Sequence, residues 1–191
     1  MARIPLDAPR TLAYRLTEWY SRRRFGTVAE PVAAMAHNPR VLISKARAEM
    51  SLEKWHALDP ALKDLAVMAA AVTVGCSWCV DFGYWISTGK GVDPAKLRAV
   101  PQWRDSDAFT DTERAVLAYA EAVSATPPAV TDAMVADLRE RLDDAALVEL
   151  TMMIAVENQR SRFNTALGLT SQGFSDRCEV PAPTLRVAAS S

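Results

Sequence analysis

The stretch that decides the fold is residues 60–91, PALKDLAVMAAAVTVGCSWCVDFGYWISTGKG. It follows Asp59, which suits a helix N-cap, and it begins with Pro60, which suits the first helical position. The helix predicted after this cap is apolar on nearly every side, which is typical of a helix buried in a core or a subunit interface. Gly75 interrupts it, and Cys76–Ser87 is expected to form the next helix. The sequence thus predicts two consecutive helices with a pair of cysteines at their junction.

The rest of the chain also has helical periodicity, and no convincing alternation typical of a strand appears. Thr110-Asp-Thr-Glu113 is a capping box that opens one helix, and Thr131 caps another. Further helices are expected over residues 11–24, 28–36, 40–50, 94–100 and 144–167. These patterns predict an all-α fold.

Composition and charge exclude several classes of protein. The 191 residues carry 22 basic and 23 acidic side chains, and a net charge of -1 gives no basic surface for nucleic acid or for a membrane. The longest uncharged stretch, Leu65–Val80, is shorter than the roughly 18–20 apolar residues that span a bilayer. The N-terminal residues lack the apolar core of a secretory signal, so we expect a cytoplasmic protein. No dinucleotide fingerprint or phosphate-binding loop is present, and we expect no cofactor.

The chemical signal of the sequence is Gly75-Cys76-Ser77-Trp78-Cys79. Two thiols three residues apart can close a small disulfide ring and reopen it by thiolate exchange. In the first turn of a helix, both sulfurs face unsatisfied backbone N–H groups and the positive end of the helix dipole. This environment raises the fraction of reactive thiolate, as a peroxide-reducing or disulfide-exchanging cysteine requires. Redox chemistry is the interpretation that these residues favour.

Three other interpretations of the cysteine pair stay open. A zinc site would need a second half, and the remaining soft ligands, Cys178, His37 and His56, have no ligand-like spacing, so we expect no metal. The two cysteines could instead be inert core residues, because free cysteine is among the most buried residue types. A permanent structural disulfide is disfavoured in a reducing cytoplasm.

The sequence resembles the alkylhydroperoxidase D / carboxymuconolactone decarboxylase family. The resemblance runs from about Asn38 to Leu169 and rests on Asn38-Pro39, the stretch Pro60–Gly91, Leu147-Val148-Glu149-Leu150 and Asn158–Asn164. It implies an all-α alkylhydroperoxidase D-like fold that assembles into homo-oligomers, trimers or larger rings. Accordingly, we expect an N-terminal helical extension over residues 1–37, the family domain over 38–170 and a C-terminal tail over 171–191.

The resemblance also implies roles for single residues. Cys79 matches the cysteine that attacks the peroxide, and Cys76 matches the cysteine that resolves the product. Asp64 stands where the family's peroxidases have a glutamate, and its shorter carboxylate could relay a proton through water. The family histidine that follows the second cysteine by four residues is replaced by Gly83, which can neither accept nor donate a proton.

Three residues are candidate replacements for this histidine: Asp81, Tyr84 and Glu157. Trp78, Phe82 and Trp85 either shape a substrate cleft or, as is commoner at this spacing, pack in a core or an interface.

These observations predict a CxxC-dependent thiol oxidoreductase that reduces hydroperoxides or exchanges disulfides. Its partners would be a small-molecule peroxide or disulfide and an external dithiol that reduces the pair again. Two alternatives stay open. One is a decarboxylase or lyase of the same family, although that branch generally lacks the CxxC pair. The other is a non-catalytic helical protein whose assembly is switched by the disulfide.

Overall fold

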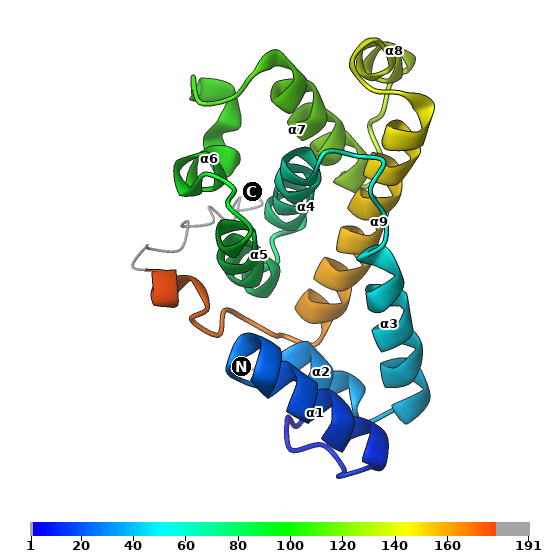
Figure 1. Cartoon of the computed structure of the whole chain (residues 1–191), viewed down its shortest axis with the longest axis vertical. Coiled ribbons are helices and arrows are strands. Elements are labelled where there is room, and N and C mark those ends of the chain that lie inside the picture. Colours follow the sequence, from blue (N-terminus) through cyan, green and yellow to red (C-terminus); the bar gives the residue numbers. More distant parts are fainter. Residues whose placement is uncertain (1, 179–191) are drawn as a thin grey trace, which may run out of the picture. The chain divides into compact units, whose positions relative to one another are not determined.

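The computed structural model describes residues 2–178, and every regular element in this range is a helix (Figure 1). The α-helices are α1 (Leu12–Phe25), α2 (Glu30–Met35), α3 (Pro39–Leu52), α4 (Pro60–Val74), α5 (Ser77–Gly89), α6 (Pro94–Ala99), α7 (Asp111–Ser124), α8 (Asp132–Arg141) and α9 (Asp144–Ala166). The 3-10 helices are η1 (Val100–Asp105) and η2 (Ser175–Cys178). The all-α prediction is confirmed.

The helices begin where local capping signals predicted. The hydroxyl of Thr110 accepts the N–H of Glu113, and the Glu113 carboxylate accepts the N–H of Thr110 at 2.8 Å, which completes the capping box of α7. Asp59 accepts two N–H groups from the first turn of α4, and the hydroxyl of Thr131 accepts the N–H of Met134 at the start of α8. Each of these contacts stabilises a helix start by satisfying a donor that has no partner within the helix.

The chain divides into two compact units. The first ends at Trp55, contains α1, α2 and α3, and also includes Leu167–Leu169. Its core is made by Ala8, Tyr14, Ala36 and Leu42, against which Ala13, Val28, Val32 and Met35 pack. The apolar side chains Leu12, Leu16, Trp19 and Tyr20 of α1 are exposed.

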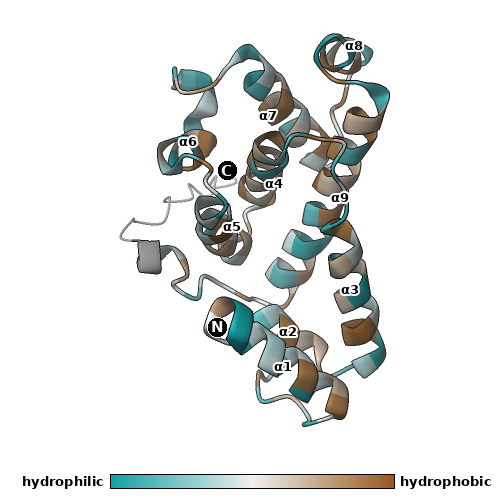
Figure 2. Cartoon of the chain, viewed as in Figure 1, coloured by the Kyte–Doolittle hydropathy of each residue, from teal (hydrophilic) through white to brown (hydrophobic). Residues whose placement is uncertain are grey.

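The second unit comprises His56–Ala166 and, in the described part of the chain, residues 170–178, and α4 is its central helix. This helix packs against α5, α7 and α9. Leu65, Ala66 and Ala70 on α4 are fully buried, as expected for a helix that is apolar nearly all round. Figure 2 shows the apolar colouring of α4 and of its neighbour α5. Because α4 is buried, its C-terminal end has a fixed position in this unit. Helix α5 starts next to that end, and the cysteines lie at this junction.

Candidate functional site

The cysteine pair lies at the junction of α4 and α5. Gly75 ends α4 in the left-handed conformation, with φ of 78°, and its N–H binds carbonyl groups of the last turn of α4. Cys76 follows as the N-cap of α5, and Cys79 lies in the first turn of that helix. The two cysteines form a disulfide, with their Cα atoms 5.3 Å apart. The sequence-predicted residues Cys76 and Cys79 are thus in direct contact.

The start of α5 supplies hydrogen-bond donors to the sulfur atoms. The Sγ atom of Cys76 occupies the place of a capping oxygen and accepts the backbone N–H of Cys79 at 3.2 Å. The positive end of the α5 dipole is directed at the same place, and it stabilises negative charge on either sulfur. Cys76 is 1% exposed and Cys79 is 7% exposed, so Cys79 is the cysteine that solvent reaches more readily.

Asn164 of α9 is a site residue that the sequence prediction missed. Its side-chain amide donates to Cys79 Sγ at 3.3 Å and lies 3.9 Å from Cys76 Sγ. The side chain is buried, so this polar group belongs to the interior of the site. The one signal in the sequence was its place at the end of the segment 158–164, because a contact across 85 residues cannot be derived from periodicity.

Asp64 is placed at the other end of the same two helices. It lies in the first turns of α4, buried, and its carboxylate accepts two hydrogen bonds from the ammonium of Lys90, at 2.8 and 3.2 Å. Lys90 follows the last residue of α5, and the length of this helix, about 20 Å, separates it from the cysteines. The proton-relay role of Asp64 therefore stays a prediction, and its contact with Lys90 supplies a structural role.

Asp81 has a role different from a replacement base. Its carboxylate accepts the backbone N–H groups of Gln172, Phe174 and Ser175 at 2.9, 3.1 and 2.7 Å. Burial by itself would raise the pKa of Asp81, but the hydrogen bonds from Ser175 and Phe174 outweigh it and lower this pKa. Asp81 is thus an ionised anchor for the segment 172–175, and it is a poor acceptor for a thiol proton.

Tyr84 and Glu157 were the other candidate replacements. Tyr84 is fully buried, and its hydroxyl has no hydrogen-bond partner among the described residues. Glu157 is buried on α9, where it accepts from the hydroxyl of Ser161 at 2.9 Å and pairs with Arg160 at 3.2 Å. These contacts give Glu157 a role in holding its own helix.

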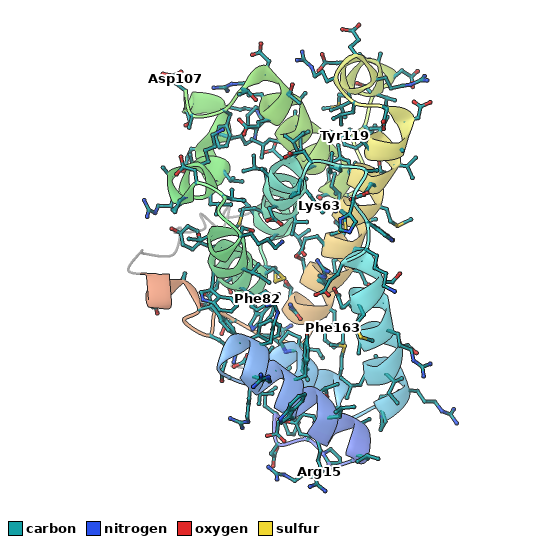
Figure 3. All side chains as sticks on the ribbon, viewed as in Figure 1. Arg15, Lys63, Phe82, Asp107, Tyr119 and Phe163 are labelled. Atoms are coloured by element: carbon teal, nitrogen blue, oxygen red, sulfur yellow. A yellow bond between two sulfur atoms is a disulfide. The ribbon has the colours of Figure 1, made fainter. Side chains whose placement is uncertain are left out.

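The aromatic residues around the cysteines pack against one another. Trp78 and Phe82 stack with ring centroids 4.9 Å apart, and Phe174 contacts both rings and Trp85 at 5.1–6.1 Å. The indole N–H of Trp78 also donates to the side chain of Gln172 at 2.8 Å. Phe82 is labelled in Figure 3, which shows the side chains crowded along α5. The core interpretation of these aromatic residues therefore agrees with the structure better than a substrate cleft.

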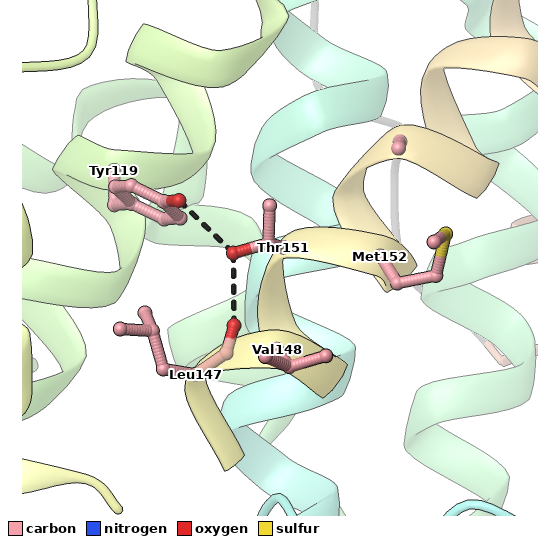
Figure 4. A pocket seen from close by; sticks show the side chains of 6 residues that line it. Tyr119, Leu147, Val148, Thr151 and Met152 are labelled. Carbon is pink, nitrogen blue, oxygen red and sulfur yellow. Dashed lines mark hydrogen bonds between the residues drawn. The ribbon is translucent and has the colours of Figure 1, made fainter. Parts of the chain in front are cut away.

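A separate hollow of about 370 Å³ lies between α7 and α9 (Figure 4). The Tyr119 hydroxyl and the Thr151 hydroxyl lie 2.9 Å apart in it, and Thr151 also donates to the Leu147 carbonyl at 2.8 Å. Val148 and Met152 form its exposed apolar part. The hollow contains neither cysteine, so it is distinct from the redox site.

No group of three or more histidine, cysteine, aspartate or glutamate side chains in the range 2–178 is arranged to hold a metal ion. No helix in the same range combines the length and the apolar character that crossing a membrane requires.

Cys76 and Cys79 form a disulfide at the start of α5, within an all-helical unit. This arrangement places the chain in the class of helical proteins that carry a redox-capable cysteine pair. The chain belongs to the alkylhydroperoxidase D / carboxymuconolactone decarboxylase family. The sequence model of the family described as "Carboxymuconolactone decarboxylase family" matches residues 43–122 of this chain. The uncharacterized protein YnjA of Escherichia coli (strain K12) is 35% identical over 171 residues, which are 89% of this chain and 92% of that protein.

Solved structures support the same fold. The debrominase Bmp8 in complex with 2,3,4-tribromopyrrole is similar with a TM-score of 0.79 at 19% identity, over 93% of this chain and 97% of that one. A protein of unknown function from Agrobacterium tumefaciens, described as a putative antioxidant defence protein AhpD, is similar with a TM-score of 0.62 at 25% identity. That likeness covers 68% of this chain and 91% of the other.

Proposed function

We propose that this protein is a thiol oxidoreductase that reduces hydroperoxides with the Cys76–Cys79 pair. The observation that carries the proposal is the disulfide itself, at the N-terminus of α5 with donors on both sulfurs. The family supports a redox role of this kind, and the putative antioxidant defence protein from Agrobacterium tumefaciens supports a peroxide as the substrate.

The cycle uses each residue in turn. The thiolate of Cys79 attacks one peroxide oxygen, the O–O bond breaks, and the alkoxide leaves and takes a proton from water, so that Cys79 becomes a sulfenic acid. The thiol of Cys76 then condenses with the sulfenic acid, which forms the disulfide and releases one water molecule. An external dithiol reduces the disulfide by exchange and is itself oxidised to a disulfide. In sum, one hydroperoxide and two thiols give one alcohol, one water molecule and one disulfide.

The test is a count of thiols before and after cumene hydroperoxide is added to the reduced protein. We expect two of the three thiols of each chain to disappear as one peroxide is consumed. Cys79→Ser should abolish peroxide consumption, whereas Cys178→Ser, the matched control, should leave it unchanged. Survival of both thiols in excess peroxide would contradict the proposal.

A second candidate function is reductive dehalogenation, because the fold is shared with the debrominase Bmp8. Two thiols would replace a carbon–bromine bond by a carbon–hydrogen bond, giving a disulfide and bromide. Bromide release from 2,3,4-tribromopyrrole, in the absence of peroxide consumption, would favour this candidate.

Catalytic activity that persists in Cys79→Ser would favour the lyase alternative, and dithiothreitol-dependent assembly without turnover would favour the switched assembly protein. The homo-oligomer expected from the resemblance stays a prediction that light scattering can test.

A further inference from the structure

Asn164 approaches the cysteine pair from a helix other than the two that carry the motif. Its amide nitrogen lies 3.3 Å from Cys79 Sγ and 3.9 Å from Cys76 Sγ, and its side chain is 2% exposed. A buried amide N–H group requires an acceptor, and the sulfur atoms supply it here. Thioether and thiol sulfur are weak acceptors. The amide is thus paired with acceptors that become strong only when they are ionised.

Because neutral sulfur is a weak acceptor, the contact with Asn164 favours one ionisation state of the cysteine over the others. A hydrogen bond to an ionised acceptor is about twice as strong as one between neutral groups, so the amide of Asn164 stabilises a thiolate more than it stabilises a thiol or a disulfide. The shorter distance is to Cys79, and the backbone N–H of Cys79 donates to Cys76 instead. Each sulfur therefore has its own donor, and the donor of Cys79 is a side chain from α9.

The position of Gly83 makes this donor relevant to the reaction. A Cβ atom at Gly83 would lie 3.5 Å from the Met68 side chain, so a side chain at this position would start on the face of α5 that meets α4. The charge on Cys79 has no histidine from that position to stabilise it. Asn164 contacts the same sulfur from α9.

We infer that Asn164 is a catalytic residue that stabilises the thiolate of Cys79 in the step that attacks the substrate, an inference that rests on the proposed function. An amide does not titrate, so the thiol proton passes to water or buffer and not to the residue that stabilises the charge. The reactivity of Cys79 should then follow a single ionisation, that of the thiol itself. A histidine would add a second one.

The experiment isolates the thiol concerned. Cys76→Ser and Cys178→Ser together leave Cys79 as the one thiol of the chain, and serine at position 76 keeps a side-chain acceptor at the N-cap. The rate of alkylation by iodoacetamide is then measured against pH. It reports the thiolate fraction and requires no peroxide chemistry. Asn164→Leu and Asn164→Asp are introduced into this background, and melting temperatures establish that each variant is folded.

We expect Asn164→Leu to move the midpoint of the alkylation curve upward by about one pH unit, a tenfold slower reaction at pH values below the midpoint. Asn164→Asp, which keeps the size of the side chain if leucine does not fold, should move the midpoint further, because a carboxylate beside the sulfur opposes its ionisation. The matched control is Asn158→Leu: Asn158 is also an amide on α9, and it donates to Ser124 at 2.7 Å and to the Ile154 carbonyl at 3.0 Å.

The outcomes separate this inference from the proposed function. An unchanged midpoint in the folded Asn164 variants overturns the inference, whether or not the protein consumes peroxide. A shift of the same size in Asn158→Leu also overturns it, because any disturbance of α9 would then suffice. A shift confined to the Asn164 variants supports the stabilisation of the Cys79 thiolate by Asn164, and a failure of the unmodified protein to consume peroxide would then contradict the proposed function alone.

Discussion

Lys90 and Asp64 form an ion pair that ties the end of α5 to the first turns of α4, with nitrogen–oxygen distances of 2.8 and 3.2 Å. The two partners differ in burial, since the side chain of Asp64 is 8% exposed and that of Lys90 is 52% exposed. Removing Lys90 should therefore destabilise the fold more than removing Asp64, because an unpaired buried carboxylate costs more free energy than an unpaired lysine at the surface.

We expect Lys90→Met to lower the free energy of unfolding by about 1–3 kcal/mol and Asp64→Asn to lower it by less, in urea titrations at neutral pH. The same two variants test the proton-relay role. Both break the ion pair, so a loss of peroxide-consumption rate in Asp64→Asn that Lys90→Met does not share would support a relay. Equal rates in the two folded variants would leave Asp64 a structural residue.

Gly83 allows the missing histidine to be put back. The nearest atom to a Cβ at this position is Met68 Cε at 3.5 Å, an ordinary contact, so a side chain can start there without displacing the backbone. If the proposed peroxide chemistry holds, Gly83→His should accelerate peroxide consumption by about 100-fold, the lower end of the range for general acid–base catalysis.

The control for this prediction is Gly83→Ala, which adds the Cβ atom but no proton acceptor. Alanine inside a helix should raise the free energy of unfolding by up to about 1 kcal/mol and leave the rate as it is. If Gly83→His and Gly83→Ala react with peroxide equally fast, then the imidazole takes no part.

Three buried carboxylates make the free energy of unfolding depend on pH. Burial would raise the pKa of Asp81, Glu113 and Glu149, but hydrogen bonds from backbone N–H groups and lysines outweigh it and lower each pKa from ordinary values of 3.8, 4.5 and 4.5. The unfolded chain then binds more protons than the folded one in the window between the two pKa values. The stabilisation is complete above about pH 4.5, and it is lost as the pH falls through the folded-state values. Urea midpoints measured from pH 7 to pH 3 should fall accordingly.

The contribution of Asp81 to this acid dependence can be separated with one substitution. Asp81→Asn should lower stability at pH 7 and flatten the decrease below about pH 4, because the asparagine has no ionisation to lose. Asp107→Asn, at an exposed position labelled in Figure 3, serves as the control and should leave the curve unchanged. An Asp81→Asn curve parallel to that of the unmodified protein would be inconsistent with the role given to this carboxylate.

Two glycines of the cysteine helix region provide a test of backbone conformation. A Cβ atom meets nothing within 4 Å at either Gly75 or Gly89, so packing does not distinguish them. Gly75 has φ of 78°, whereas Gly89 is the last residue of α5 and has no left-handed φ. We expect Gly75→Ala to cost about 1 kcal/mol and Gly89→Ala to be neutral or mildly stabilising, as thermal unfolding would show. Equal melting temperatures would mean that the turn before Cys76 does not depend on glycine.

Local signals were sufficient to predict most helices. The capping box at Thr110 and the caps at Asp59 and Thr131 are contacts between a side chain and a backbone N–H two or three residues away, so the sequence displays them directly. The Cys76–Cys79 pair was predictable for the same reason, since both thiols lie in one turn. The family resemblance added the fold to these local predictions.

Contacts between distant segments could not be predicted in this way. Asn164 reaches Cys79 across 85 residues, and Asp81 reaches Gln172 across 91. Helical periodicity tells which face of a helix is apolar but not which helix covers it. The partner of Asp64 was missed on the same ground, because Lys90 lies 26 residues away and its pairing depends on how α4 and α5 pack.

Asp81 holds the segment 172–175 through main-chain N–H groups, and these are present at every residue except proline. These main-chain contacts by themselves therefore place few demands on the side chains of the segment 172–175. Among related chains, position 175, where the side chain is 1% exposed, should accept small residues other than proline, while position 174 is restricted by the aromatic rings around Phe174. An aligned set of homologues should show a conserved acidic residue on the helix opposite a segment without proline at positions 172, 174 and 175.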